Sequence, residues 1–404
     1  MMNTRRCFLV VATLLLGLLP RVSAQAAPPS TPAIAAALQP FVDSHTLAGA
    51  VTLVANKDKV LSLDTVGYMD VAAKTPMRAD CLFWIASMSK PMTAAGLMML
   101  VDEGRLSLDD PVERYLPEFQ GQMLAAEQKP DHVLLKLPGH PMTIREALSH
   151  TSGLPFMTRL ERGKVDTLTL HEATINYALT PLDYQPGTKH AYSNAGINTA
   201  GRVIEVVSGM PYEEFMEKRL FAPLGMTDTT FWPNPEQLAR LAKSYHPKGA
   251  QQDLEETTIS QLSYPLDNRK RGPSPAGGLF STASDVGVFC QMVLGGGVYH
   301  GKRYLSAAAV QQMTSTQTGD LLGRGPNEGG YGLGWSTSRK LHRPSDPAPV
   351  GPCGHGGAYS TNMWVDPPRG LVTVYMVQHA GYPGKDGGQI WPALQNAAYT
   401  AFAK

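Results

Sequence analysis

Apolar residues alternate with polar ones near both ends of the chain, and this two-residue period predicts β-strands. The two clearest cases are each split by a polar or proline-containing turn, so each is interpreted as a β-hairpin. Their strands are expected at residues 49–54 and 60–66, and at residues 360–365 and 371–377. Shorter strands are expected at residues 279–281 and 330–336.

Apolar residues at three- and four-residue spacing predict helices at both ends and throughout the middle of the chain. The expected helices cover residues 34–41, 88–103, 143–149, 170–179, 198–207, 212–220 and 390–402, with another that begins at a cap on Ser284 or Asp285. Gly104 follows the second of these helices and suits its C-terminus.

Strands at both ends with helices between them predict an α/β (α+β) fold, in which an antiparallel sheet is flanked by helices and carries an inserted, mostly helical domain. The expected sheet domain comprises residues 33–86 and 273–404, and the helical domain comprises residues 87–272.

The N-terminus has the pattern of a secretory signal peptide. Arg5 and Arg6 precede an apolar run at residues 7–19, and small residues follow up to Ala24. The run is too short for a stable membrane span, which needs about 20 residues. Residues 1–24 are therefore expected to be a cleaved signal peptide and residues 25–32 a flexible leader, which predicts a periplasmic or secreted protein.

Charge argues against two classes of partner. Loss of Arg5, Arg6 and Arg21 with the signal peptide leaves 32 basic against 34 acidic residues. Nucleic acids and anionic membrane surfaces select for basic patches, so neither is expected as a partner.

The mature chain would keep three cysteines, Cys81, Cys290 and Cys353. Three cysteines are too few for a disulfide framework in a chain of this size, so buried free thiols are favoured. One bridge with an odd thiol left over stays open.

Candidate chemistry begins at Ser87-Met88-Ser89-Lys90. Residues three apart on a helix share a face, so Lys90 can remove the proton that keeps the Ser87 hydroxyl from attacking a carbonyl. Pro91 is tolerated only in the first turn of a helix, which places Ser87 at the helix start. There the Ser87 amide can supply half of an oxyanion hole. Lys90 must be neutral to act as a base, and its apolar neighbours Trp84, Met88 and Met92 would desolvate it.

Tyr192 and Asn194 lie in a polar loop that ends in glycine. Tyr192 is a candidate for moving protons between Ser87 and a leaving group, and Asn194 could hydrogen-bond both Lys90 and a substrate amide or ester.

His355-Gly356-Gly357 precedes the strand expected at residues 360–365, and these three residues are expected to bind substrate together with Asn194 and Ala358. Glycines there let the backbone approach a ligand closely, and the amide of Ala358 would supply the other half of the oxyanion hole.

Other catalytic patterns are missing from the sequence. His171-Glu172 begins like a zinc-protease helix, but no histidine follows at the required spacing, so no metal is expected. No Gly-x-Ser-x-Gly elbow, phosphate loop or dinucleotide fingerprint occurs, so no cofactor is expected either.

The ordered motifs Ser87-x-x-Lys90, Tyr192-x-Asn194 and His355-Gly356-Gly357 resemble those of the serine β-lactamase and penicillin-binding protein superfamily. The most similar branch contains class C β-lactamases, D-Ala-D-Ala carboxypeptidases and family VIII carboxylesterases. Supporting segments occur at residues 148–154, 221–226 and 277–282. The resemblance implies a β-lactamase/transpeptidase-like fold in which Ser87 is acylated and Lys90 and Tyr192 share the proton transfers. It also implies that the Ser87 and Ala358 amides hold the oxyanion.

The third motif departs from the family pattern. Class C β-lactamases carry Lys-Thr-Gly, whereas this chain has His355 and Gly356 in place of the lysine and threonine. The loss of that cation and hydroxyl should weaken recognition of an anionic substrate, by about 1.5–3 kcal/mol for one hydrogen bond to a charged group. Glycine in the middle position resembles the esterases more.

The sequence therefore predicts an exported serine hydrolase that cleaves esters of small to medium acyl groups through an acyl-enzyme on Ser87. A D-Ala-D-Ala carboxypeptidase or D-amino-acid peptidase, with weak β-lactamase activity, stays open as an alternative. A non-catalytic module that binds cell-wall fragments is a third reading. Candidate pocket walls are Trp84, Phe156, Trp335, Tyr359 and Trp364. The sequence gives no indication of the oligomeric state.

Overall fold

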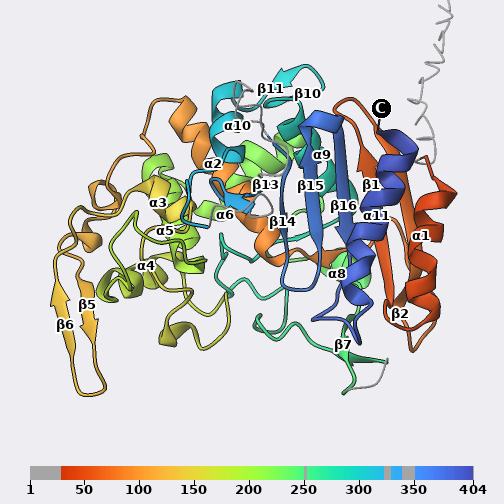
Figure 1. Cartoon of the computed structure of the whole chain (residues 1–404), viewed down its shortest axis with the longest axis horizontal. Helices are drawn as coiled ribbons and strands as arrows, with labels where there is room; N and C mark the ends of the chain where they lie inside the picture. Colours follow the sequence, from red (N-terminus) through yellow and green to blue (C-terminus); the bar gives the residue numbers. More distant parts are fainter. Residues whose placement is uncertain (1–28, 250–252, 323–328, 339–350, 404) are drawn as a thin grey trace, which may run out of the picture.

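The computed structural model describes residues 29–249, 253–322, 329–338 and 351–403. Its largest element is an antiparallel sheet of eight strands (Figure 1), in the order β12-β13-β14-β15-β16-β1-β2-β3. These strands are β1 (Gly49–Ala55), β2 (Val60–Asp70), β3 (Thr75–Pro76), β12 (Gly329–Tyr331), β13 (Ser336–Ser338), β14 (Cys353–Gly356), β15 (Asn362–Asp366) and β16 (Leu371–Met376). The predicted antiparallel sheet flanked by helices is confirmed.

The two ends of the chain meet in the middle of this sheet. Both predicted hairpins are present, as β1 with β2 and β15 with β16. They join because β1 pairs antiparallel with β16, so that Val51 lies opposite Met376.

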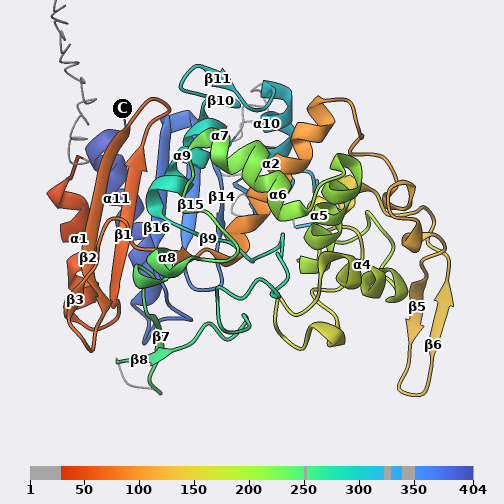
Figure 2. The ribbon, with the colours of Figure 1, turned by 180° about the vertical axis from the view of Figure 1, so that it is seen from behind.

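Successive residues of β1 point to opposite faces of the sheet, as the pleat requires. Ala50 and Val54 pack against α1 (Pro32–Asp43) and α11 (Gly387–Phe402). Val51 and Leu53 belong to the larger core on the other face, where Leu53 touches Gly287 of α9 (Ala283–Leu294). Figure 2 shows α9 against this second face and α1 and α11 at the outer edge of the molecule.

The middle of the chain is largely helical, as predicted. Its helices are α2 (Ser89–Asp102), α3 (Ile144–Leu148), α4 (Leu170–Leu179), α5 (Asn194–Ser208), α6 (Tyr212–Met216), α7 (Ala222–Leu224) and α8 (Pro235–Ala239), and α10 (Ala307–Thr314) follows α9. A π-helical turn, η5 (Glu217–Phe221), joins α6 to α7.

Two predicted helix starts are corrected by a side-chain cap, and α11 also begins earlier than expected, at Gly387 and not at residue 390. Helix α5 begins four residues earlier than expected, because the Ser193 hydroxyl accepts from the Gly196 amide. Helix α9 is capped by Thr282, not by Ser284 or Asp285, because the Thr282 hydroxyl accepts from the Asp285 amide.

The single strand predicted at residues 330–336 is wrong. The segment forms two paired strands, β12 and β13, because Gly334 takes φ +73° in the turn between them. The His-Gly-Gly segment also lies partly inside a strand, since β14 pairs with β15.

Four further two-stranded pairs occur among the residues that the structure describes. They are β4 (Phe83–Trp84) with β9 (Phe280–Ser281), β5 (Leu124–Gln128) with β6 (Val133–Lys136), β7 (Ser244–Pro247) with β8 (Leu254–Thr257), and β10 (Val298–Tyr299) with β11 (Lys302–Arg303). The β5–β6 hairpin was not predicted from the sequence, because the apolar run in β6 does not alternate with polar residues.

The predicted signal peptide and residues 25–28 of the leader lie outside the described residues. The next residues are tied to β2, because the Ser30 hydroxyl donates to Asp64 at 2.5 Å and the Leu63 amide donates to the Pro29 carbonyl. Within the described part of the chain, no helix is long and apolar enough to cross a membrane. Cys81, Cys290 and Cys353 are buried free thiols.

Candidate active site

Ser87 lies in a single 3-10 turn, η1 (Ala86–Met88), that leads directly into α2. The β4–β9 pair fixes this turn from one side, and the Trp84 indole donates to the Gly277 carbonyl at 2.8 Å. Ala86 takes φ +45°, a left-handed conformation that strains a residue with a side chain. Such strain beside a half-buried serine is typical of a residue held for reaction.

Lys90 is completely buried one turn along the same helix face. Its Nζ lies 2.9 Å from Ser87 Oγ and 2.7 Å from the Ala276 carbonyl oxygen. The Ala276 amide is in turn fixed by Asn198 Oδ1 at 3.0 Å. Burial lowers the pKa of the Lys90 amine well below its usual value. A neutral amine can donate to Ala276 while its lone pair accepts the Ser87 proton.

Tyr192 covers this pair, with its ring centroid 4.7 Å from Lys90 Nζ. His150 holds the tyrosine from both sides along the chain. The Ala191 amide donates to the His150 carbonyl at 2.9 Å, and the Ser193 amide donates to His150 Nδ1 at 3.1 Å. Burial raises the pKa of the Tyr192 phenol, and a hydrogen bond with Ser87 only partly offsets this rise. The phenol is therefore protonated at neutral pH.

His355 is buried beside Tyr192 with 6% of its surface exposed. Its Nδ1 lies 2.7 Å from the Gly356 carbonyl, which can only accept, so Nδ1 carries the proton. Nε2 is then the acceptor, 3.0 Å from the Tyr331 hydroxyl and 3.5 Å from the Tyr192 hydroxyl. Burial is the main reason that the pKa of His355 falls to about 3. The imidazole is uncharged at neutral pH, and both ring nitrogens are occupied within the protein.

Gly357 lies against the backbone that precedes Ser87. A Cβ at Gly357 would lie 2.6 Å from the Ile85 carbonyl oxygen and would also clash with Thr361 Oγ1. Only glycine therefore lets this segment, and the exposed Ala358 after it, approach the serine. Gly356 is different, because a Cβ there would meet its nearest neighbours at 3.5 and 3.8 Å, which is ordinary contact.

Asn194, the first residue of α5, donates its backbone amide to the Phe156 carbonyl at 3.0 Å. Its side-chain Oδ1 is buried without a hydrogen-bond partner. The expected hydrogen bond from Lys90 to this oxygen is therefore not made.

Three members of the cluster were not predicted from the sequence: Tyr331, His150 and His190. The His150 ring lies 4.4 Å from the Tyr192 ring and 4.5 Å from the Tyr331 ring, and the His190 and Tyr331 rings are 5.6 Å apart. His150 belongs to a segment that had supported the resemblance, but nothing in its local pattern assigns it a task. Tyr331 carried no signal, because it reaches His355 only through the turn that was mistaken for a strand interior.

Among the candidate pocket walls, only Phe156 is an exposed aromatic beside the cluster. Its ring is stacked on Tyr192 with 6.2 Å between the ring centroids. Trp84, Trp335 and Tyr359 are buried in the core, and Trp364 lies only partly exposed on β15.

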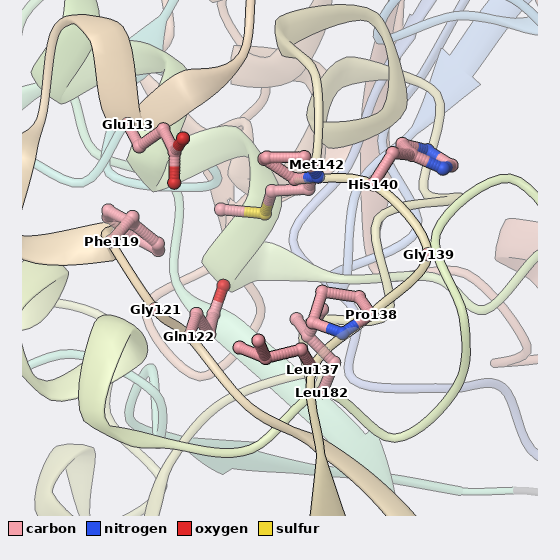
Figure 3. A pocket seen from close by; sticks show the side chains of 11 residues that line it. Glu113, Phe119, Gly121, Gln122, Leu137, Pro138, Gly139, His140, Met142 and Leu182 are labelled. Atoms are coloured by element: carbon pink, nitrogen blue, oxygen red, sulfur yellow. The ribbon is translucent and has the colours of Figure 1, made fainter.

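The described residues contain no group of three or more histidine, cysteine, aspartate or glutamate side chains placed to hold a metal ion. They do contain a separate cavity of about 230 Å³ at the base of the β5–β6 hairpin. Figure 3 shows Phe119, Leu137, Met142 and Leu182 around this hollow, with Glu113 on its rim. None of the residues around Ser87 lines it.

The chain combines an antiparallel sheet and a helical insert with a serine hydroxyl, that of Ser87, beside the buried amine of Lys90. This combination of fold and site is that of a serine hydrolase. Residues 34–398 match the Beta-lactamase family, and the chain belongs to that family. The resemblance that the three motifs indicated is thereby confirmed, and the chain is a serine hydrolase of the β-lactamase family.

The named relatives include both an esterase and a penicillin-binding protein. Esterase EstB of Burkholderia gladioli is 30% identical over 385 residues, which are 87% of this chain and 91% of that protein. A penicillin-binding protein of Bacillus subtilis is 31% identical over 212 residues, which are 50% of this chain and 43% of that protein. The solved structure of EstCE1, a hydrolase with promiscuous acyltransferase activity, has 25% identity and a TM-score of 0.73 and covers 91% of this chain and 98% of its own.

Proposed function

We propose that the protein is a carboxylesterase that cleaves uncharged esters of small to medium acyl groups through an acyl-enzyme on Ser87. The observation that carries the ester preference is the state of His355, which is buried, uncharged and turned toward Tyr192 and Tyr331. Class C β-lactamases carry a lysine at this position of the third motif, and the uncharged His355 does not replace the charge of that lysine. The similarity to EstB and EstCE1 supports the same reading.

Acylation begins with neutral Lys90. Its lone pair takes the Ser87 proton across 2.9 Å as Ser87 Oγ attacks the ester carbonyl. The amides of Ser87 and Ala358 are assigned to the oxyanion, which would be the largest electrostatic contribution to the rate.

Tyr192 acts next, as an acid. Its raised pKa keeps the phenol protonated, so it can give that proton to the departing alkoxide and recover one from the Lys90 ammonium. Water then attacks the acyl-enzyme with Lys90 as base, and Ser87 leaves as the alcohol.

His355 is assigned a positioning role in this scheme, with Tyr331 behind it. Because its Nε2 accepts from both tyrosine hydroxyls, it orients the Tyr192 phenol. His355 is not assigned a direct contact with a substrate carboxylate.

The test compares purified wild type and Ser87→Ala on p-nitrophenyl butyrate, a chromogenic cephalosporin and a D-Ala-D-Ala peptide. We expect the butyrate ester to have the highest kcat/KM and Ser87→Ala to lose at least about 10³-fold with an unchanged melting temperature. Retained activity in Ser87→Ala would remove the nucleophile assignment. A higher kcat/KM on the peptide or the cephalosporin would remove the ester preference and leave the nucleophile in place.

One observation favours the alternative, a peptidase or amidase that acts on D-amino-acid substrates. The unpartnered Asn194 Oδ1 can accept a hydrogen bond, and an amide substrate brings an N–H donor where an ester has none. Asn194→Ala separates the two, because it should reduce amide turnover more than ester turnover only if this oxygen binds a substrate N–H.

A further inference from the structure

A chain of buried hydrogen bonds runs from Lys90 into the helical region. Lys90 Nζ lies 2.7 Å from the carbonyl oxygen of Ala276. The Ala276 amide donates to Asn198 Oδ1 at 3.0 Å, and Asn198 Nδ2 donates to the Tyr177 hydroxyl, also at 3.0 Å. The Tyr177 hydroxyl donates to Glu161 Oε1 at 2.7 Å, and Glu161 ends the turn η4 (Arg159–Glu161). All five residues are buried, so the chain ends on a carboxyl group inside the protein.

Two backbone amides, one at each end, fix the directions of these bonds. The Ala276 N–H can only donate, so it meets the oxygen of Asn198, whose nitrogen then donates to the oxygen of Tyr177. The proton of Tyr177 is left for Glu161 Oε1, and the Thr158 N–H donates to Glu161 Oε2 at 2.5 Å. A chain with a fixed donor at each end needs one member that accepts on both sides, and a carboxylate does so.

Water offers these groups little alternative. The hollow lined by Glu161, Tyr177 and Asn198, among others, has a volume of about 10 Å³, which is room for one water molecule at most. A buried donor or acceptor that loses its partner is costly, so the bonds of this chain are expected to reverse together or not at all.

The Ala276 carbonyl matters because Lys90 is completely buried. Lys90 Nζ lies within hydrogen-bond distance of Ser87 Oγ and of this carbonyl oxygen. Once Lys90 has taken the Ser87 proton, the serine oxygen is bonded to the acyl group, and the carbonyl oxygen still accepts from the ammonium. A buried ammonium needs such an acceptor, so the position of Ala276 affects the rate of acylation.

We propose that Glu161, acting through Tyr177, sets the orientation of the Asn198 amide. The N–H and the C=O of Ala276 flank one Cα, so the bond from this N–H to Asn198 also fixes the carbonyl to which Lys90 donates. Asn198, Tyr177 and Glu161 are therefore positioning residues. This assignment rests on the function proposed above, in which Lys90 is the base.

Glu161→Gln tests the orientation directly. The Thr158 N–H still needs an acceptor, so the glutamine oxygen turns toward it and the glutamine nitrogen faces Tyr177. Tyr177 must then donate to Asn198, whose amide flips and turns its nitrogen toward the Ala276 N–H. Two donors then face each other, and we expect kcat to fall about 10- to 100-fold with an unchanged KM.

Asn198→Asp provides the compensating change. Alone, it places a carboxylate on each side of Tyr177, whose single proton serves one of them, so kcat should fall here too. Combined with Glu161→Gln, it exchanges the carboxylate and the amide, and every donor has an acceptor again. The double variant should return to within about threefold of the wild-type kcat. Because its carboxylate favours the ammonium form of Lys90, the plateau values of kcat at high pH are compared.

Gln122→Ala is the control for a lost buried hydrogen bond in the same region. Gln122 Nε2 donates to the backbone carbonyl of Tyr177, and not to its hydroxyl. The control should lower the melting temperature and keep the wild-type kcat, measured at a temperature where every variant is folded. Wild-type kcat in both single variants of the chain, with only the melting temperature lowered, would overturn the proposal. A double variant no better than the single ones would overturn it as well.

Two reactions separate this proposal from the ester assignment. One is hydrolysis of p-nitrophenyl butyrate, and the other is labelling of Ser87 by a fluorophosphonate. In the labelling, the Ser87 oxygen bonds to phosphorus, fluoride leaves and Lys90 takes the Ser87 proton, so no ester bond is involved. Slow labelling in both single variants and restored labelling in the double variant would support the positioning role even if the ester is a poor substrate. A wild type that is not labelled would remove Ser87 as the nucleophile and overturn the positioning role with it.

Discussion

The neighbouring glycines of the third motif provide a matched pair of substitutions. Gly357→Ala adds a Cβ within 2.6 Å of the Ile85 carbonyl oxygen, and this oxygen belongs to the backbone that leads into Ser87. Gly356→Ala adds the same atom one residue earlier, where its nearest neighbour is 3.5 Å away. The two variants differ in whether the strand can approach the serine, and in little else.

The expected losses follow from these distances. A Cβ closer than 3.0 Å to backbone forces the two segments apart, which costs about 1–3 kcal/mol of unfolding free energy as overpacking does. The same movement withdraws the Ala358 amide from the oxyanion, and the loss of one such donor lowers kcat about 10²–10³-fold. Gly356→Ala should stay within about threefold of wild type in kcat and within about 0.5 kcal/mol in stability.

The assay combines p-nitrophenyl butyrate kinetics with urea unfolding, both at a temperature where all three proteins are folded. If Gly357→Ala keeps wild-type kcat while losing stability, the Ala358 amide is not an oxyanion donor. If Gly356→Ala loses as much activity as Gly357→Ala, the contact with Ile85 is not what makes glycine necessary.

Three more predictions rest on the same site. Lys90→Met should abolish ester hydrolysis yet raise the free energy of unfolding at pH 7. At that pH Lys90 binds a proton in the unfolded chain, whereas the folded chain resists this protonation, and the methionine variant removes the difference. Urea unfolding from pH 6 to 10 should show that the gain in stability shrinks as pH rises, and a loss of stability in the variant would contradict the prediction. His355 has a pKa of about 3 in the folded chain and an ordinary pKa of 6.5, so the unfolded chain takes up the proton first as pH falls. Wild-type stability should therefore fall as pH drops from about 6.5 toward 3, and His355→Gln should reduce that fall in acid-unfolding curves. Phe156→Ala should raise KM for aromatic esters about five- to tenfold, which corresponds to the loss of one ring–ring contact. The melting temperature should stay unchanged, because the ring is exposed. Equal KM values for the variant and the wild type would remove Phe156 from the substrate site.

Local spacing explains why part of the site could be predicted from the sequence. Ser87 and Lys90 are three residues apart on one helix, so their proximity follows from helix geometry alone. The position of Pro91 correctly indicated a helix start, and α2 begins at Ser89. The two neighbouring hairpins of the sheet followed from alternation and turn residues in the same way.

Other properties depended on contacts between distant segments. The neutral state of His355 follows mainly from its burial, and Tyr331, which β12 brings to it across the sheet, lies at hydrogen-bond distance from its Nε2. The sequence had made His355 a candidate substrate-binding residue, because it occupies the position of the lysine in the third motif of class C β-lactamases. His150 was missed for a related reason, since it acts through backbone amides on either side of Tyr192, and these leave no trace in residue type.

The pairing of β1 with β16 also constrains how the protein is made. Val51 pairs with Met376, so the second edge of β1 is covered only after almost the whole chain has been synthesised. Contacts this distant in sequence slow folding, and until they form β1 presents an open edge to other chains. Tyr331 and His355 also arrive late, so the site near Ser87 is assembled only after the sheet begins to close. A chain released before residue 371 should therefore be inactive and prone to aggregate. Active hydrolase is expected only once β16, the last strand, has been synthesised.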